Sequence, residues 1–387
     1  MTDTPITRFK LAFAVAKYIE FGGMQRTMLR IARECKHRGH DVHMFTGDLQ
    51  GDSPPAMPVR VLPLRALSNH GRYREFGRKL GAAVQGGAFD CVVGSTKGPG
   101  LDVYYAGDPC YAAKVDENRS AFYKLLPRYR ALRALESAVF SAGANTEILL
   151  IAHREREKFM HYYGTQATRF HLLPPGIDRQ RLVQHVPSPQ ERKRLREELG
   201  VHGEDYLLLN VGSRFQTKGI DRILIALAAL PKQRRRHIKL AVVGGDEPRP
   251  FLRLARRLGV IEHVRFTGAR DDVAAFYHAA DLLVHPAYTE NTGTTLIEAM
   301  ICGLPVLATA NCGFAFHVEN AKAGLICPLP YEQAQLNHLL EEMLVAERLA
   351  GWRSRGPVYC ANTDLYSLVE KAADIIIARA ERGRAEK

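Results

Sequence analysis

Short apolar runs alternate with helix-like segments along the whole chain, and this alternation limits the folds that the chain can adopt. Runs at 8–15, 103–106, 206–211 and 282–285 have the length and the apolar character of buried strands. Between such runs, apolar residues recur at the three- and four-residue spacing of a helix, as they do over 24–35. Short strands that alternate with helices of about 10–15 residues favour parallel sheets with helices on both faces. The sequence therefore predicts an α/β fold with doubly wound, Rossmann-like sheets.

The same patterns place the remaining elements. Further strands are predicted at 42–46, 59–64, 89–94, 147–152, 170–173, 239–244, 264–267, 306–309 and 324–327. Further helices are predicted at 73–84, 121–140, 154–163, 221–230, 251–258, 273–280, 295–302 and 365–382.

The length of 387 residues favours two domains over one. A Pro-Pro-Gly turn at 174–176, followed by a polar and charged stretch at 178–199, marks the boundary between them. We therefore expect an N-terminal domain over 1–176 and a C-terminal domain over 177–364. The closing segment, 365–387, is expected to form a helix that packs back on the N-terminal domain.

Composition excludes several classes of protein. Hydrophobic residues make up 46% of the chain and charged residues 25%, which excludes a disordered or collagen-like chain. No run approaches the roughly 20 apolar residues of a membrane-spanning helix, and the apolar segment at 11–16 is too short for the core of a signal peptide. Seven cysteines without a CxxC pair favour reduced, buried thiols in the cytosol. Because no metal-binding motif is present, we expect neither a metal nor a cofactor.

The charge balance points to anionic partners. Lysine and arginine total 54 residues against 41 aspartates and glutamates, which gives a formal net charge of +13. Such a surplus bears on partners and not on the fold. Nucleic acid, an anionic membrane surface and a phosphorylated substrate all remain candidates.

Two glycine-containing loops follow predicted strands, which is where ligands sit in open parallel sheets. Gly22 and Gly23 would let backbone amides approach an anion at the start of a helix. Arg214 and Lys218 lie in a turn that opens with Gly212, and a diphosphate leaving group needs such cations. A plain strand-to-helix turn and solvated cations are the alternatives for these two loops.

Two carboxylates eight residues apart, Glu290 and Glu298, flank the loop that follows the strand at 282–285. Glu290 could accept hydrogen bonds from sugar hydroxyls, and Glu298 could hold a ribose diol from the first turn of a helix. The loop residues whose amides could face a phosphate are Asn291, Thr292, Gly293 and Thr294. Thr295-x-x-Glu298 also fits a capping box, in which the glutamate binds the backbone of the capping residue. Both interpretations of Glu298 stay open.

These residues together resemble glycosyltransferase family 4, whose members are retaining sugar-nucleotide enzymes of the GT-B fold. The resemblance is closest to the lipopolysaccharide core glucosyltransferases of that family, and it spans the chain from residue 11 to about residue 377. The motifs that carry it, besides the glutamate pair, are Phe21-Gly22-Gly23-x-Gln25-Arg26, Asn69-His70-Gly71-Arg72, Gly107-Asp108-x-Cys110-Tyr111, Leu173-Pro174-Pro175-Gly176-Ile177 and His285-Pro286-Ala287-Tyr288.

The resemblance implies two Rossmann-like domains that face each other across a cleft, with UDP-glucose as the donor. The implied donor-binding residues are Gly22, Gly23, Arg214, Lys218, Arg270, Glu290, Asn291, Thr292, Gly293, Thr294 and Glu298. Within this set the cations would neutralise the diphosphate, Glu298 would hold the ribose, the backbone near Arg270 the uracil, and Glu290 the glucose. The implied acceptor is a heptose of the lipopolysaccharide inner core, glucosylated with retention at the anomeric carbon.

Two positions depart from the family pattern. Many members have an arginine directly after the glycine that corresponds to Gly212, whereas here Ser213 stands there and Arg214 follows. Many also have a histidine in the first domain near the reacting carbon, where this chain has Asp108. The resemblance then implies same-face displacement through an oxocarbenium-like state, in which Asp108 stabilises positive charge or orients the acceptor hydroxyl. A turn residue before Pro109 is the alternative.

A basic segment with interleaved aromatic and apolar residues lies in the first domain. Its cations are Lys114, Arg119, Lys124, Arg128, Arg130 and Arg133, and the residues between them include Tyr111, Phe122, Tyr123, Leu125, Leu126 and Tyr129. Such a segment suits an anionic membrane interface, and a solvated face over a core helix is the alternative. We expect a cytoplasmic enzyme bound peripherally to the inner membrane. Candidate contacts for a phosphorylated inner-core sugar are His70, Arg72, Lys97 and Arg119.

Two other functions stay open. A UDP-sugar 2-epimerase of the same fold would share the nucleotide cradle but would need proton-transfer groups at the sugar. A basic nucleic-acid-binding protein is a different class, and the lack of a recognition motif and an aromatic content of 8% argue against it.

Overall fold

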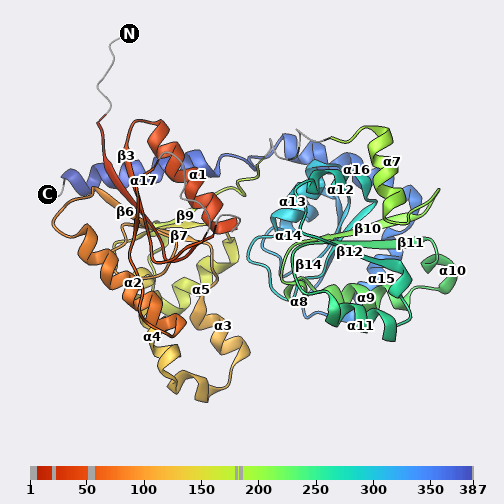
Figure 1. Cartoon of the computed structure of the whole chain (residues 1–387), viewed down its shortest axis with the longest axis horizontal. Coiled ribbons are helices and arrows are strands. Elements are labelled where there is room, and N and C mark those ends of the chain that lie inside the picture. The colour runs from red at the N-terminus through yellow and green to blue at the C-terminus, as the bar shows by residue number, and fades with distance from the viewer. Residues whose placement is uncertain (1–6, 20–22, 51–56, 179–181, 183–185, 386–387) are drawn as a thin grey trace, which may run out of the picture. The chain divides into compact units, whose positions relative to one another are not determined.

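The structure is a computed structural model that describes residues 7–19, 23–50, 57–178, 182 and 186–385. The chain divides into two units (Figure 1), the first comprising Met1–Gly176 with Ser367–Lys387 and the second comprising Ile177–Tyr366. Each unit is built on a parallel sheet with helices on both faces. The predicted α/β fold is therefore confirmed.

The first unit holds a seven-stranded sheet in which all neighbouring strands are parallel. In order across the sheet, the strands are β5 (Val59–Val61), β3 (Asp41–Thr46), β1 (Lys10–Val15), β6 (Cys91–Gly94), β7 (Val103–Ala106), β8 (Glu147–Leu150) and β9 (Phe170–Leu172). A short parallel ladder pairs β2 (Tyr18–Ile19) with β4 (Leu49–Gln50). The helices of this unit are α1 (Gly23–His37), α2 (Asn69–Val84), α3 (Tyr111–Asn118), α4 (Pro127–Phe140), α5 (His153–Tyr163) and α17 (Leu368–Ala385).

The residues of β1 alternate between the two faces of this sheet, because successive side chains of a strand point to opposite faces. Leu11, Phe13 and Val15 belong to the apolar cluster that α1 and α17 cover. Ala12 and Ala14 belong to the cluster that α2, α4 and α5 cover on the other face. The small side chains on that second face leave room for the aromatic residues of the helices.

Helix α17 comes from the other end of the chain and lies beside α1 (Figure 1). Leu368, Ala372 and Ile376 of α17 are buried in the same cluster as β1. Arg379 Nη2 lies 3.0 Å from Asp102 Oδ1, so an ion pair also joins α17 to the loop before β7. The core of the first unit is therefore built from two distant parts of the sequence.

The second unit holds a six-stranded parallel sheet. In order, its strands are β12 (Val264–Gly268), β11 (Ile238–Val243), β10 (Tyr206–Val211), β13 (Leu282–His285), β14 (Val306–Thr309) and β15 (Gly324–Cys327). Its helices are α7 (Pro189–Glu198), α8 (Phe215–Lys218), α9 (Ile220–Ala229), α10 (Lys232–Arg235), α11 (Arg249–Arg257), α12 (Val273–Ala279), α13 (Thr294–Ile301), α14 (Ala315–Ala321), α15 (Gln333–Met343) and α16 (Ala346–Ala361). Helices α9, α11 and α15 cover one face, and α12, α13 and α14 cover the other.

Several regions differ from the sequence predictions. The single helix predicted over 121–140 is wrong: a 3-10 turn at Ala121–Leu125 precedes α4, because Pro127, which has no amide hydrogen, is favoured in the first turn of a helix and begins α4. Helix α7 lies in the polar stretch where no helix is predicted. Its start is a capping box, in which the Ser188 hydroxyl accepts from the Glu191 amide and the Glu191 carboxylate accepts from the Ser188 amide. Helices α3, α8, α10, α14, α15 and α16 are likewise absent from the sequence predictions.

None of the helices within the described residues is both long enough and apolar enough to span a bilayer.

Candidate functional site

Two loops of the second unit lie side by side at the carboxyl edge of its sheet. Strands β10 and β13 are adjacent and parallel, with Leu208 opposite Leu282, so both end at the same edge. The loop after β10 leads to Lys218, and the loop after β13 leads to Glu290. The two loops touch where the Tyr288 amide donates to the Thr217 carbonyl at 2.9 Å. Ligands bind at this edge in open parallel sheets.

A three-residue cluster forms where these loops meet. The Lys218 ammonium donates to Glu290 Oε2, and the two side chains are only 17% and 14% exposed. His285 is fully buried at the end of β13, and its Nε2 lies 3.5 Å from the same carboxylate oxygen. The sequence predicts Lys218 and Glu290 as donor-binding residues, and the structure brings them into direct contact.

The cluster keeps the Glu290 carboxyl ionised. Burial alone would raise the pKa of Glu290, but its contacts with His285 and Lys218 outweigh burial and lower that pKa to about 2. Burial lowers the pKa of His285, so its imidazole is neutral at pH 7. The result is a charged hydrogen-bond acceptor in contact with an ammonium group.

The backbone of the first loop explains how Lys218 reaches this position. Gly212 adopts a φ of +143° at the end of β10, and a Cβ atom there would stand 3.0 Å from Lys218 Cε. A larger residue at Gly212 would therefore displace the lysine side chain. Arg214 adopts a φ of +59° directly before α8 and is exposed. Within the described part of the chain, the Arg214 guanidinium has no ion pair, so it is accessible to an anion.

The second loop is held in place by the segment that follows β14. The Gly313 amide donates to the Glu290 carbonyl at 3.1 Å, and the Phe314 amide donates to the Thr292 carbonyl at 2.7 Å. Gly293 has a φ of +90° and begins α13. The amides of Thr294 and Thr295 lie in the first turn of α13, where backbone amides lack an acceptor within the helix, and so suit an anion.

Glu298 does not act as a helix cap. Because Gly293 in the left-handed region starts α13 at Thr294, Glu298 lies in the second turn, beyond the capping position, and the helix has no side-chain cap. The capping-box alternative is therefore wrong. Glu298 Oε2 instead accepts from the Tyr277 hydroxyl at 2.7 Å, and Tyr277 is buried in α12.

Arg270 follows β12, and its side chain is engaged locally. Its Nε and Nη2 atoms lie 2.8 and 2.7 Å from the two carboxylate oxygens of Asp272. This leaves the backbone near Arg270, and not its guanidinium, as the predicted contact for a base.

The first unit has a cavity of about 340 Å³ at the carboxyl edge of its own sheet. Its walls come from the ends of β1, β6 and β7 and from α1, α2, α3 and α4. Its lining residues include Lys17, Gln25, Tyr73, Lys97, Asp108 and Lys114. Three predicted residues, Asp108, Lys97 and Lys114, therefore share one cavity. Lys17 and Gln25 also line this cavity but are not among the site residues predicted from the sequence. Their position after the first predicted strand could have identified them.

The other predicted acceptor contacts do not line this cavity. His70 Nε2 lies 3.4 Å from the Ser68 hydroxyl, and Arg72 Nη2 lies 3.6 Å from Asp48 Oδ2. The Arg119 guanidinium stacks over the Tyr123 ring at 5.5 Å. Gly23 is the first residue of α1, while Gly22 lies outside the described residues.

The basic segment of the first unit is exposed. Phe122, Leu125 and Leu126 are 79%, 63% and 47% exposed in and directly after the 3-10 turn. Among the nearby cations, Lys124 Nζ lies 2.7 Å from Asp116 Oδ1, and the Arg133 guanidinium lies 4.3 Å from the centre of the Tyr163 ring. Arg128 and Arg130 are also exposed, with no ion pair to any residue that the structure describes. Lys114 instead lines the cavity described above.

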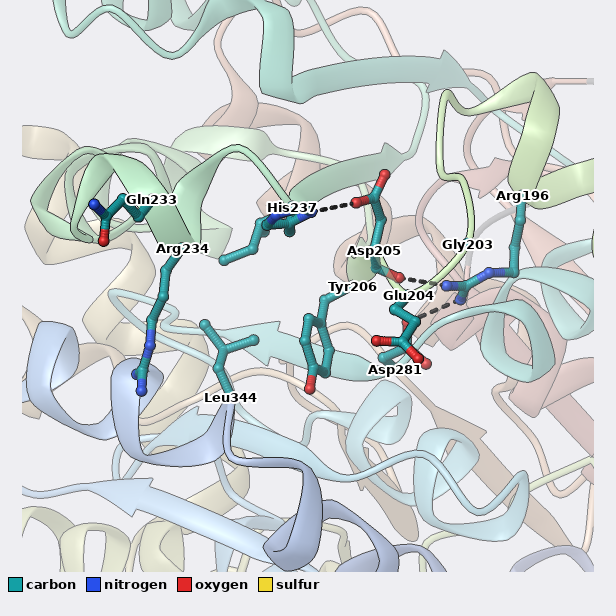
Figure 2. Close-up of a pocket in the computed structure, with 11 residues that line it drawn as sticks. Arg196, Gly203, Glu204, Asp205, Tyr206, Gln233, Arg234, His237, Asp281 and Leu344 are labelled. Carbon is teal, nitrogen blue, oxygen red and sulfur yellow. Dashed lines mark hydrogen bonds and ion pairs between the residues drawn. The ribbon is translucent and has the colours of Figure 1, made fainter.

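A larger cavity, of about 610 Å³, lies at the opposite edge of the second sheet (Figure 2). Its charged groups bind one another: Arg196 lies 2.8 Å from Asp281 Oδ2, and His237 Nδ1 lies 3.0 Å from Asp205 Oδ1. This edge carries the amino ends of the strands, away from the loops that bind ligands in such folds. We therefore do not assign the site to this cavity.

Comparisons with known proteins identify the family. A family model described as "Glycosyltransferase Family 4" matches residues 21–181, and one described as "Glycosyl transferases group 1" matches residues 191–351. Lipopolysaccharide glucosyltransferase WaaG of Escherichia coli strain K12 is 42% identical over 367 residues, which cover 95% of this chain and 98% of WaaG. The chain belongs to glycosyltransferase family 4.

Solved structures agree with this family 4 assignment. A crystal structure of WaaG, described as a glycosyltransferase involved in lipopolysaccharide biosynthesis, matches with a TM-score of 0.87 at 42% identity, over 95% of this chain and 99% of that one. HepE of Anabaena, solved in complex with UDP and glucose, matches with a TM-score of 0.72 at 19% identity, over 95% of this chain and 100% of that one, and shows the fold alone. The predicted GT-B architecture of two Rossmann-like domains is confirmed.

Proposed function

We propose that this family 4 glycosyltransferase transfers glucose from UDP-glucose to a heptose of the lipopolysaccharide inner core, with retention at the anomeric carbon. The observation that carries the proposal is the ionised Glu290 carboxylate held against Lys218 at the carboxyl edge of the second sheet. The overall identity of 42% to a lipopolysaccharide glucosyltransferase supports the same donor sugar and acceptor class.

The second unit binds the donor. Lys218, the exposed Arg214 and the first amides of α13 surround the diphosphate with positive potential. Glu290 accepts hydrogen bonds from glucose hydroxyls, since its low pKa keeps it a carboxylate. Glu298, which Tyr277 orients, accepts from the ribose hydroxyls. The backbone near Arg270 contacts the uracil.

Transfer proceeds by displacement on one face of the sugar. The bond between the anomeric carbon and the diphosphate oxygen breaks, and its electron pair stays with the oxygen. The acceptor oxygen forms the new bond on the same face while its proton passes to the departing diphosphate. Lys218 and Arg214 stabilise the charge that develops on the leaving group. Asp108, in the cavity of the first unit, stabilises the oxocarbenium-like sugar or orients the acceptor hydroxyl.

The chain supplies the counter-charge for the diphosphate itself, so the reaction needs neither a metal nor a cofactor. Lys218 and Arg214 carry the two positive charges that a metal ion would otherwise provide.

The first unit binds the acceptor and the membrane. Lys17 and Lys114 at the cavity beside Asp108 suit a phosphorylated inner-core sugar. The exposed Phe122 and Leu125 would enter the headgroup region, and neighbouring arginines would bind anionic lipids. We propose that the enzyme works at the cytoplasmic face of the inner membrane, where it would meet its lipid acceptor.

The test is a matrix of donors and acceptors with the purified protein. UDP-glucose, UDP-galactose and their N-acetyl forms are each incubated with lipopolysaccharide truncated at the heptose region. We expect UDP release and one added hexose, detected by mass, only with UDP-glucose and the heptose acceptor. Conversion of the UDP-sugar without acceptor would establish an epimerase instead. Salt-dependent retention on DNA without UDP release would point to a nucleic-acid-binding protein.

A further inference from the structure

A carboxylate in the core of the first unit gathers an unusual number of donors. Glu136 on α4 is fully buried, and its oxygens accept from the Tyr111 amide at 2.8 Å and the Ala112 amide at 3.1 Å. The Lys97 ammonium and the Tyr163 hydroxyl also donate to it. Buried carboxylates occur in proteins when they are paired and hydrogen-bonded in this way.

Two of these donors, the Tyr111 and Ala112 amides, belong to the segment that directly follows Asp108. Lys97 also donates to the Pro109 carbonyl at 3.0 Å, and the Cys110 amide donates to the buried Glu155 carboxylate at 2.6 Å. Each of the three residues after Asp108 is therefore held by a hydrogen bond to its backbone. These residues are Pro109, Cys110 and Tyr111. Asp108 itself is exposed at the cavity wall.

We infer that Glu136 and Lys97 are positioning residues, which fix the loop after β7 so that Asp108 borders the acceptor cavity. This inference rests on the proposed function, because it takes Asp108 as a group that meets the reacting atoms. It gives Lys97 a role different from the predicted acceptor contact: its ammonium is already bound by Glu136 and by the Pro109 carbonyl. Glu136 and Lys97 therefore affect the reaction only by positioning Asp108.

The inference predicts coupling between Glu136 and Asp108. Glu136→Gln keeps the side-chain size but removes the charge that binds Lys97 and the α3 amides. We expect it to lower kcat about tenfold or more and to leave the KM for UDP-glucose within about twofold, because the charged donor-binding residues lie in the second unit. Asp108→Asn should cause a similar loss, and the double variant should lose little more than either single variant. The inference would be overturned if the fold-loss of kcat in the double variant equalled the product of the two single losses. A Glu136→Gln enzyme with the kcat of the wild type would also overturn it.

Two further variants separate positioning from folding. Glu136→Gln combined with Lys97→Met leaves no unpaired charge in the core, and we expect it to fold and to show the same loss of kcat. Tyr163→Phe removes another donor from the same carboxylate without touching the loop, and we expect unchanged kcat. Equal losses in Tyr163→Phe and Glu136→Gln would show a general effect of core disruption and overturn the inference.

A readout without activity keeps this inference separate from the proposed function. Hydrogen exchange followed by mass spectrometry reports the amides of Tyr111 and Ala112 directly. We expect Glu136→Gln to increase exchange at these amides and not in β10 or β11, while Tyr163→Phe leaves them protected. Unchanged protection in Glu136→Gln would overturn the inference even in an active enzyme. A wild-type protein that transfers no sugar but shows the expected exchange would overturn the proposed function and leave the anchoring of the loop established.

Discussion

At the scale of single residues, the ion pair between Lys218 and Glu290 has a consequence for donor binding. Each group partly cancels the charge of the other before a ligand arrives. A diphosphate therefore has to compete with the Glu290 carboxylate for the lysine. In the proposed complex, Glu290 favours turnover because it binds the glucose, but it opposes binding of UDP because it competes for Lys218.

This competition predicts opposite effects of two substitutions. Glu290→Gln should lower kcat at least about tenfold, which is roughly 1.4 kcal/mol of barrier, and should leave UDP affinity equal or higher. Lys218→Met should weaken UDP binding and lower kcat together. Isothermal titration with UDP and steady-state kinetics measure both quantities. UDP affinity reduced to the same extent in both variants would contradict the competition.

The pH dependence of stability follows from the same cluster. Because the folded pKa of Glu290, about 2, lies below its ordinary value near 4.5, this carboxylate stabilises the fold above pH 4.5 and loses that effect as pH falls toward 2. The lowered pKa of His285 acts in the same direction, beginning as pH falls below about 6.5. We expect Glu290→Gln to reduce the loss of thermal stability between pH 4.5 and pH 2.5, measured by calorimetry. An identical profile for the two proteins would refute this assignment.

Glu298 should affect binding more than turnover. Since Tyr277 fixes its carboxylate and the sugar end of the donor lies elsewhere in the proposed complex, Glu298→Ala should raise the KM for UDP-glucose about tenfold with a small change in kcat. Tyr277→Phe keeps the carboxylate and should raise KM less. A fall in kcat at unchanged KM would assign Glu298 to the chemical step.

At the scale of elements, the structure separates the cations of the basic segment into two groups. Arg128 and Arg130 on α4 are exposed, whereas Lys124 is paired with Asp116 and Arg133 packs on Tyr163. Only unpaired surface cations contribute their full charge to an anionic surface. The membrane contact proposed for this segment therefore depends mainly on the first turn of α4.

Vesicle binding tests this division. Replacing Arg128 and Arg130 by glutamine should weaken affinity for anionic vesicles at low salt about thirtyfold, measured by co-sedimentation, since each cation contributes about 1 kcal/mol. The same change at Arg256 and Arg257, exposed on α11 of the second unit, is the matched control and should have little effect. Equal weakening by the two pairs would indicate a response to net charge only.

The sequence predicts most strands because buried parallel strands are short apolar runs, and it predicts the ligand loops because they follow those strands. The sequence does not predict the break before Pro127 in the segment 121–140, because the apolar period continues across the proline. The roles of His285 and Glu136 could not be found either. His285 lies in an apolar strand and Glu136 in an amphipathic helix, and only the fold brings their partners to them.

At the scale of the whole molecule, the proposed site relies on protein cations for the diphosphate. Glucosyl transfer should therefore be unchanged after exhaustive treatment with EDTA and dialysis, and added magnesium should raise the rate less than about twofold. UDP release and hexose addition are measured together. Loss of activity with chelator and its return with a divalent ion would require a metal in the mechanism.

The position of α17 has a consequence for synthesis of the protein. Nascent chains fold domain by domain, generally from the N-terminus. Here the apolar face of β1 stays uncovered by α17 until the ribosome has made the entire second unit and released the last helix. The first unit to be translated is thus the last to be completed, and its core lacks the apolar side chains of α17 throughout synthesis of the second unit.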